Sequence, residues 1–126
     1  MMLFQTEILL EPKLSLPPIY IGQMAKIAFD RTIRYAKGWM PVSATPEQLA
    51  PKIKELMKQA KAAGRGKLEV IAMKTLPLDD LDSAQKMAVA YKEAGATQLV
   101  HTQGYDSVEH YGEIIDKLEK SIKPLI

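Results

Sequence analysis

The chain has 126 residues, of which 47% are hydrophobic and 25% are charged, and its formal net charge is +2. These proportions are typical of one globular domain and argue against a disordered chain. The absence of cysteine excludes disulfides and thiolate chemistry. The lysines are spread along the chain with few aromatic residues nearby, so we expect no nucleic-acid partner.

Residues 1–17 precede the regular part of the chain. Residues 3–10 alternate as a strand does, and the three prolines within residues 11–18 predict an extended connector. The start lacks a basic region and carries Glu7 in its apolar run, which is unlike a signal peptide. No apolar run reaches the roughly 18 residues that a membrane span needs. We therefore expect a cytoplasmic protein with no membrane partner.

A βαβ unit is predicted next, and the rest of the chain repeats it. A short apolar run at residues 19–21 leads into Gly22 and a helical pattern that ends at Lys37. Gly38 is expected to stop the helix, and residues 39–42 form a second apolar run. Units of this kind build parallel sheets. The inward face of the helix is predicted to hold Ala25, Ala28, Phe29, Thr32 and Ala36.

Three more units of about 30 residues each follow, so residues 18–126 are predicted to be four successive βα units. Pro51 is expected to kink or delay the second helix. The glycines that end helices are predicted to be Gly64 and Gly95. Capping boxes predict helix starts at Thr45, Asp82 and Asp106.

Each of these later helices carries an apolar stripe, and the last helix is the most amphipathic. The stripes are Leu49, Ile53, Leu56, Met57 and Ala60; then Ala84, Met87, Ala88 and Tyr91; then Val108, Tyr111, Ile114, Ile115, Leu118 and Ile122.

The strand at residues 68–73 is apolar on both faces apart from Glu69, which is typical of a parallel strand covered on both sides. The last strand is expected at residues 97–101. Four βα units suit two architectures: a small open sheet with helices on both faces, or half of an eight-stranded barrel of about 250 residues with every helix outside. The pattern alone does not choose between them.

Several runs resemble the C-terminal part of the luciferase-like monooxygenase family. They are LEPKLSLPPIYIG, which is followed by a helix rich in small residues, then YAKGWMPV and TPEQL, and finally EAGATQLVHTQG before the terminal helix. The resemblance extends from Leu10 to the end of the chain. It implies an α/β fold in which four βα units form half of a TIM-type (β/α)8 barrel, with parallel strands and helices on one side.

Members of this family use FMN or a deazaflavin to oxidise small organic molecules, so the resemblance implies a flavin- or deazaflavin-dependent oxidoreductase. Only the last four barrel strands are represented here. An isolated half barrel has open edges and a bare inner face. We therefore expect a homodimer or higher oligomer, or a separate front-half chain as partner. The alternative is a non-catalytic remnant or assembly module without a cofactor.

The first βα turn is the candidate phosphate site, because helix N-termini favour anions. The resemblance places cofactor contacts at Gly22, Gln23, Met24 and Lys26. Gly22 matches the family, but its hydroxyl side chains are absent and Met24 replaces a donor. A plain strand-to-helix turn is the alternative, and we favour it.

His101 is the candidate catalytic residue, because it ends the last strand and histidine titrates near neutrality. Gln103 lies just beyond it and is a candidate cofactor contact. No acidic partner for His101 can be assigned, and a packed, hydrogen-bonded histidine is the alternative that we favour. Trp39 would stack on a planar ring according to the resemblance, whereas its apolar neighbours favour a core position.

We expect no metal site. Asp79, Asp80 and Asp82 lack the spacing of a calcium loop, so a solvated loop is the better interpretation. The two histidines have no metal-ligand companions at helical spacing.

Overall fold

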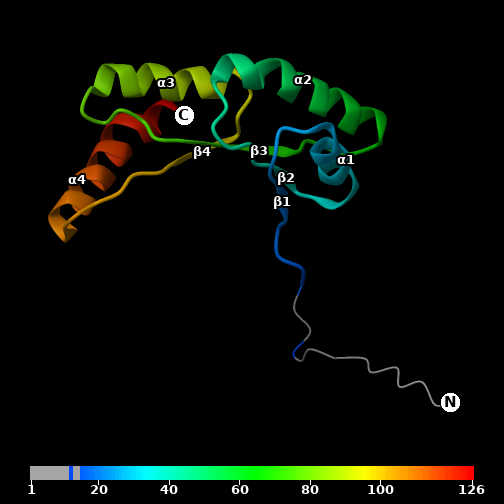
Figure 1. Ribbon diagram of the computed structural model, residues 1–126, viewed down its shortest axis with the longest axis horizontal. Coiled ribbons are helices and arrows are strands. Elements are labelled where there is room, and N and C mark those ends of the chain that lie inside the picture. The colour runs from blue at the N-terminus through cyan, green and yellow to red at the C-terminus, as the bar shows by residue number, and fades with distance from the viewer. Residues whose placement is uncertain (1–11, 13–14) are drawn as a thin grey trace.

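The computed structural model describes residue 12 and residues 15–126 (Figure 1). The strand predicted at residues 3–10 lies outside this part. Within it, four parallel strands form one sheet in the order β1-β2-β3-β4. The strands are β1 (Tyr20–Ile21), β2 (Gly38–Trp39), β3 (Glu69–Lys74) and β4 (Gln98–His101). The prediction of an α/β fold with parallel strands is confirmed.

A helix follows each strand. The helices are α1 (Lys26–Tyr35), α2 (Pro46–Ala62), α3 (Leu81–Glu93) and α4 (Val108–Lys117), and α4 continues into η1 (Leu118–Ile122) and η2 (Lys123–Leu125). None of the helices in the described part is long and apolar enough to cross a membrane.

The helices pack against one another in chain order: α1 against α2, α2 against α3, and α3 against η1. Figure 1 shows α2 and α3 lying along one face of the sheet. Val70 and Ala72 of β3 are buried in the same cluster as apolar residues of α2 and α3. Ile71 and Met73 point to the opposite face, because side chains alternate along a strand. Neither of the core clusters includes them.

The start of α2 follows the sequence prediction. The Thr45 hydroxyl accepts a hydrogen bond from the Gln48 amide at 3.3 Å, and the Gln48 side chain accepts one from the Thr45 amide at 3.0 Å. Pro51 lies inside this helix, which continues without interruption to Ala62. The late restart predicted at Pro51 is therefore wrong. Burial of the apolar stripe on both sides of Pro51 compensates for the one backbone bond that proline cannot donate.

Two predicted helix caps are wrong. The cap of α3 is Asp80, whose carboxylate accepts hydrogen bonds from the Ser83 amide and hydroxyl, whereas Asp82 lies in the first turn. The cap of α4 is Ser107 and not Asp106. In both cases a neighbouring residue has an equally suitable side chain, and the loop geometry decides which of the two occupies the cap.

The sequence predicted that Gly38 stops α1, and this is wrong, because Gly38 lies in β2. A Cβ atom there would be 2.3 Å from the Glu69 carbonyl oxygen, so glycine is required by the close approach of β2 and β3. The end of α1 is instead held by Arg65, whose guanidinium donates hydrogen bonds to the Ile33 and Ala36 carbonyls at 2.5 and 2.7 Å. Gly64 and Gly95 have φ of +73° and +105° and end α2 and α3 as predicted.

The stripes of the first three helices form most of the core, as the spacing predicted, except that Ala25 is exposed and Met57 and Met87 are only partly buried. Trp39 is fully buried, with its ring edge-to-face against Phe29 at a centroid distance of 5.1 Å. The stripe of α4 differs. Ile114 and Ile122 are buried and Leu118 is partly buried, but Val108, Tyr111 and Ile115 are exposed. The buried members of the first three stripes are Ala28, Phe29, Thr32 and Ala36; Leu49, Ile53, Leu56 and Ala60; and Ala84, Ala88 and Tyr91.

Candidate functional site

The turn between β1 and α1 has an unusual backbone. Gln23 has a φ of +72°, and its carbonyl oxygen accepts a hydrogen bond from the Trp39 indole nitrogen at 2.8 Å. The N-cap of α1, Ala25, makes no side-chain cap bond. Within the described residues, the amides of Lys26 and Ile27 have no acceptor. The turn therefore presents unsatisfied donors at a helix N-terminus, which favours an anion.

The side chains of this turn contribute unequally. Lys26 is exposed and is the first residue of α1, so it adds a positive charge to the helix turn that carries these amides. Met24 is partly buried and packs against the main core cluster, so it anchors the turn to the core. At Gly22 an added Cβ atom would lie 3.9 Å from the Met40 carbonyl oxygen, an ordinary contact. Packing alone does not require a glycine at this position.

Trp39 is a core residue, as its apolar neighbours in the sequence predicted. Its register with Val70 places it on the helix-covered face of the sheet, and none of its surface is exposed. Its hydrogen bond to Gln23 fixes the shape of the first turn. The indole ring therefore positions the candidate phosphate site and has no open face on which a flavin ring would stack.

His101 ends β4, where the sequence placed it. It lies two residues after Leu99 and therefore on the helix-covered face of the sheet. There it lines a cavity of about 320 Å³ together with apolar residues of α4 and η1. The Leu76 amide donates to His101 Nδ1 at 3.0 Å, and Nε2 lies 2.9 Å from Gln103 Oε1. Both ring nitrogens of His101 therefore have a hydrogen-bond partner within the chain.

The predicted site residues form two separate groups. Gln23 and Trp39 are bonded at the β1 end of the sheet, and His101 and Gln103 are bonded at the β4 end. Since β1 and β4 are the edge strands of the sheet formed by the described residues, the structure places the two groups at opposite edges of that sheet.

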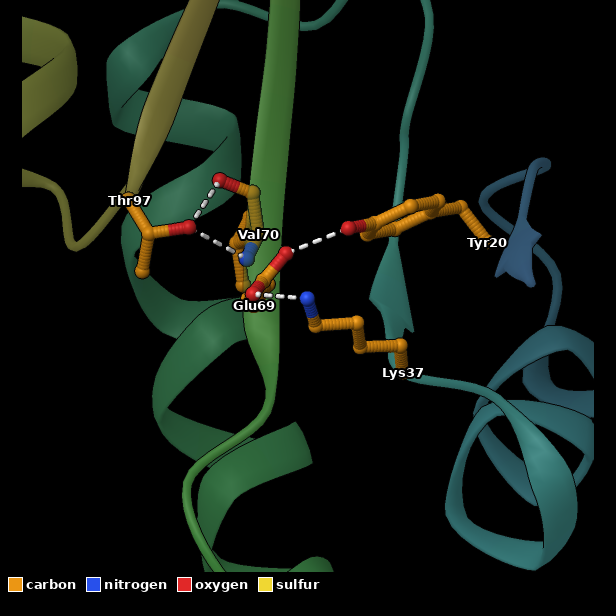
Figure 2. Close-up of polar contacts among 5 residues, drawn as sticks. All are labelled: Tyr20, Lys37, Glu69, Val70 and Thr97. Atoms are coloured by element: carbon orange, nitrogen blue, oxygen red, sulfur yellow. Dashed lines mark hydrogen bonds and ion pairs between the residues drawn. The ribbon is translucent and has the colours of Figure 1, made fainter. Parts of the chain in front are cut away.

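A polar cluster that sequence reasoning missed lies on the sheet face opposite the helices. Figure 2 shows Tyr20 and Lys37 both pointing at Glu69. The Tyr20 hydroxyl donates to Glu69 Oε2 at 2.5 Å, and Lys37 Nζ lies 3.0 Å from Oε1. Gly38 lies between Tyr20 and Glu69 in the register, and its missing side chain lets the phenol reach across β2. The only signal in the sequence was Glu69 within an apolar strand.

The three groups of this cluster shift one another's pKa values. The hydrogen bond from Tyr20, followed by the one from Lys37, lowers the pKa of Glu69 below its ordinary value. The same carboxylate raises the pKa of Tyr20 and of Lys37, in each case chiefly through the hydrogen bond. The cluster lies at the N-terminal ends of the strands, away from the βα turns. In barrels, that end contributes to stability.

The start of β4 is joined to β3 by Thr97. Its hydroxyl accepts a hydrogen bond from the Val70 amide at 2.9 Å and donates one to the Val70 carbonyl at 3.0 Å (Figure 2). These bonds fix the register of the longest strand pair and hold the ends of β3 and β4 level with each other.

The aspartates at the start of α3 each have a protein partner. Asp80 caps α3, Asp82 pairs with Lys86 at 2.7 Å, and Asp79 lies 3.7 Å from Lys117. Within the described residues, no group of three or more acidic, histidine or cysteine side chains is arranged to hold a metal ion.

Comparison with known proteins leaves the family open: no family model matches this chain, and no curated protein matches it.

Proposed function

We propose that this chain is the C-terminal half of a luciferase-like, flavin- or deazaflavin-dependent oxidoreductase barrel, and that its β1–α1 turn binds the cofactor phosphate. The observation that carries the proposal is the α1 N-terminus, where the amides of Lys26 and Ile27 have no acceptor among the described residues and Lys26 adds a positive charge to the first turn. The sheet supports it as well. Four parallel strands in sequential order, with the helices packed in the same order, are what half of such a barrel requires.

The residues present fit the phosphate end of the cofactor better than its ring. The Lys26 and Ile27 amides and the Lys26 ammonium would hold the phosphate, and Trp39 would keep the turn in shape through Gln23. When bound, the flavin or deazaflavin supplies hydride-transfer chemistry. Gln103 and His101 are engaged with each other at the far edge of the sheet. On this proposal the chain contributes cofactor binding, and a second barrel half contributes the groups around the ring.

The second candidate function is a non-catalytic assembly module. The observation that favours it is that Trp39 and His101 both have structural partners: the indole is bonded to Gln23, and both imidazole nitrogens are bonded. On this view the β1–α1 turn binds no phosphate, and the chain serves only to complete a barrel.

Titration of the purified protein with FMN, followed by fluorescence quenching, separates the two candidates. Riboflavin, which lacks the phosphate, is the matched ligand, and the reduced and oxidised deazaflavin coenzymes are titrated in parallel. We expect a Kd of tens of micromolar for FMN or the deazaflavin, riboflavin weaker by about tenfold, and Lys26→Glu weaker by a similar factor. Lys54→Glu on α2 is the control variant. Equal affinity for FMN and riboflavin, or no binding of any of these ligands at about 100 μM, overturns phosphate binding at this turn.

A further inference from the structure

The outermost helices leave apolar side chains uncovered. On α1, Ile27 and Tyr35 are exposed, and on α4, Val108 is 82% exposed and Ile115 is also exposed. Figure 1 shows α1 and α4 at opposite ends of the molecule, so neither can cover the other within one copy. Among the described residues, each of these helices has a packed helical neighbour on one side: α1 contacts α2, and the turns after α4 contact α3.

Four of the exposed residues of α1 form one stripe, which we call the α1 stripe: Ile27, Arg31, Arg34 and Tyr35. Their spacing places them on one side of the helix. The same residues, with Asp30, line a shallow hollow of about 320 Å³. Three basic residues and one acidic residue in α1 give this helix a net charge of +2.

Four of the exposed residues of α4 make up what we call the α4 stripe: Val108, Glu109, Ile115 and Asp116. Tyr111 and Glu113 of the same helix are also exposed. Val108 and Ile115 are two turns apart, and a carboxylate follows each of them directly. Three acidic residues and one lysine give α4 a net charge of −2. Within the described part of the chain, Arg31, Arg34 and Glu109 take part in no ion pair, and Asp116 pairs only with Lys120 of the next turn.

The topology shows how the two stripes can meet. In the described sheet, β1 and β4 each pair with one neighbour only and point the same way. A twofold axis parallel to the strands places β4 of one copy beside β1 of the other, again parallel, and does so twice. Both open edges then disappear, and α4 of each copy lies beside α1 of its partner.

We propose that the α1 and α4 stripes are the two halves of a self-complementary interface, through which two copies of this chain close an eight-stranded barrel. A second copy is the occupant because the stripes match each other in charge, +2 against −2, and because both pair exposed apolar residues with charged ones. The inference does not depend on cofactor binding. It rests on the half-barrel part of the proposed function, and the charge-reversal variants that test it leave Lys26 and Ile27 of the phosphate site unchanged.

Charge reversal with rescue tests this interface. The molar mass of four samples is measured by light scattering and sedimentation equilibrium: the wild type, R31E/R34E, E109K/D116K, and an equimolar mixture of the two variants. The wild type is expected to be a dimer. Each variant alone is expected to dissociate, with a dimer Kd at least tenfold higher, because like charges face each other at both contacts. The mixture is expected to regain the mass of a dimer, since the heterodimer has one contact with both charges reversed and one wild-type contact.

The control is K54E/K58E, which makes the same change in charge on the exposed side of α2 and is expected to leave the dimer intact. Circular dichroism establishes that each variant is folded. Because all the substituted residues are exposed, we expect native spectra. Val108→Ser provides an uncharged test and is expected to weaken the dimer severalfold. A monomeric wild type, variants that remain fully dimeric, or a mixture that remains monomeric would each overturn the proposal. A failed FMN titration would not affect it.

Discussion

The burial of α3 and α4 runs against the regularity of their apolar stripes. The stripe of α4 is more regular than that of α3, yet α3 buries Ala84, Ala88 and Tyr91, whereas α4 buries only Ile114. The difference lies in their neighbours. α3 lies between α2 and the C-terminal turns, whereas α4 ends the helix layer. A strong apolar periodicity therefore marks the side of a helix that is suited to burial, including a side that the described part of the chain leaves exposed.

The largest effect is expected at the centre of the sheet. Gly38→Ala places a methyl group 2.3 Å from the Glu69 carbonyl oxygen, between two backbones that cannot separate without breaking β2–β3 pairing. We expect a loss of about 3 kcal/mol or more of unfolding free energy, measured by urea denaturation. Gly66→Ala is the control, because an added Cβ there meets nothing within 4 Å, and its effect should stay within about 0.5 kcal/mol. Equal effects of the two substitutions would show that β2 and β3 are not so close.

Two alanine substitutions, one in a central helix and one in an outer helix, compare how much each helix contributes to stability. Leu56 of α2 is fully buried, and Leu56→Ala is expected to cost about 3 kcal/mol through the lost contacts and the remaining cavity. Ile115 of α4 is exposed, and Ile115→Ala is expected to cost less than about 1 kcal/mol in dilute protein. Urea denaturation at the lowest workable concentration gives both values. Similar costs would mean that α4 is packed as tightly as α2.

The smallest effect concerns pH and the cluster at Glu69. The pKa of this carboxyl is lowered from an ordinary 4.5, so its contribution to stability is present above that value and is lost as the pH falls through the lowered pKa. Tyr20→Phe removes the largest cause of the lowering. We expect NMR titration to show a higher pKa for Glu69 in the variant, and the urea midpoint to depend less on pH in the acid range. An unchanged Glu69 titration would show that the Tyr20 hydroxyl does not contact it.

Local signals in the sequence predicted much of the fold. Helix periodicity placed Leu49, Ile53 and Leu56 in the core, and the capping box at Thr45 was confirmed, because both depend only on residues a few positions apart. The caps of α3 and α4 were wrong by one or two residues, since adjacent polar side chains compete for the same position.

Long-range geometry could not be predicted in the same way. The bond from Tyr20 to Glu69 depends on the register of three strands, and no local pattern specifies that register. The face on which His101 lies depends on where β4 begins, because a shift of one residue would turn its ring to the other side of the sheet. The candidate site was therefore predicted as a set of residues, but its division between the two sheet edges was not.

The guanidinium of Arg65 holds the last turn of α1 from a loop that belongs to the following βα unit. The first unit thus cannot be cut out as a self-sufficient fragment, because its C-terminal carbonyls would lose their donor. A circular permutant or a dissected chain would have to keep Ile33 and Arg65 on the same piece.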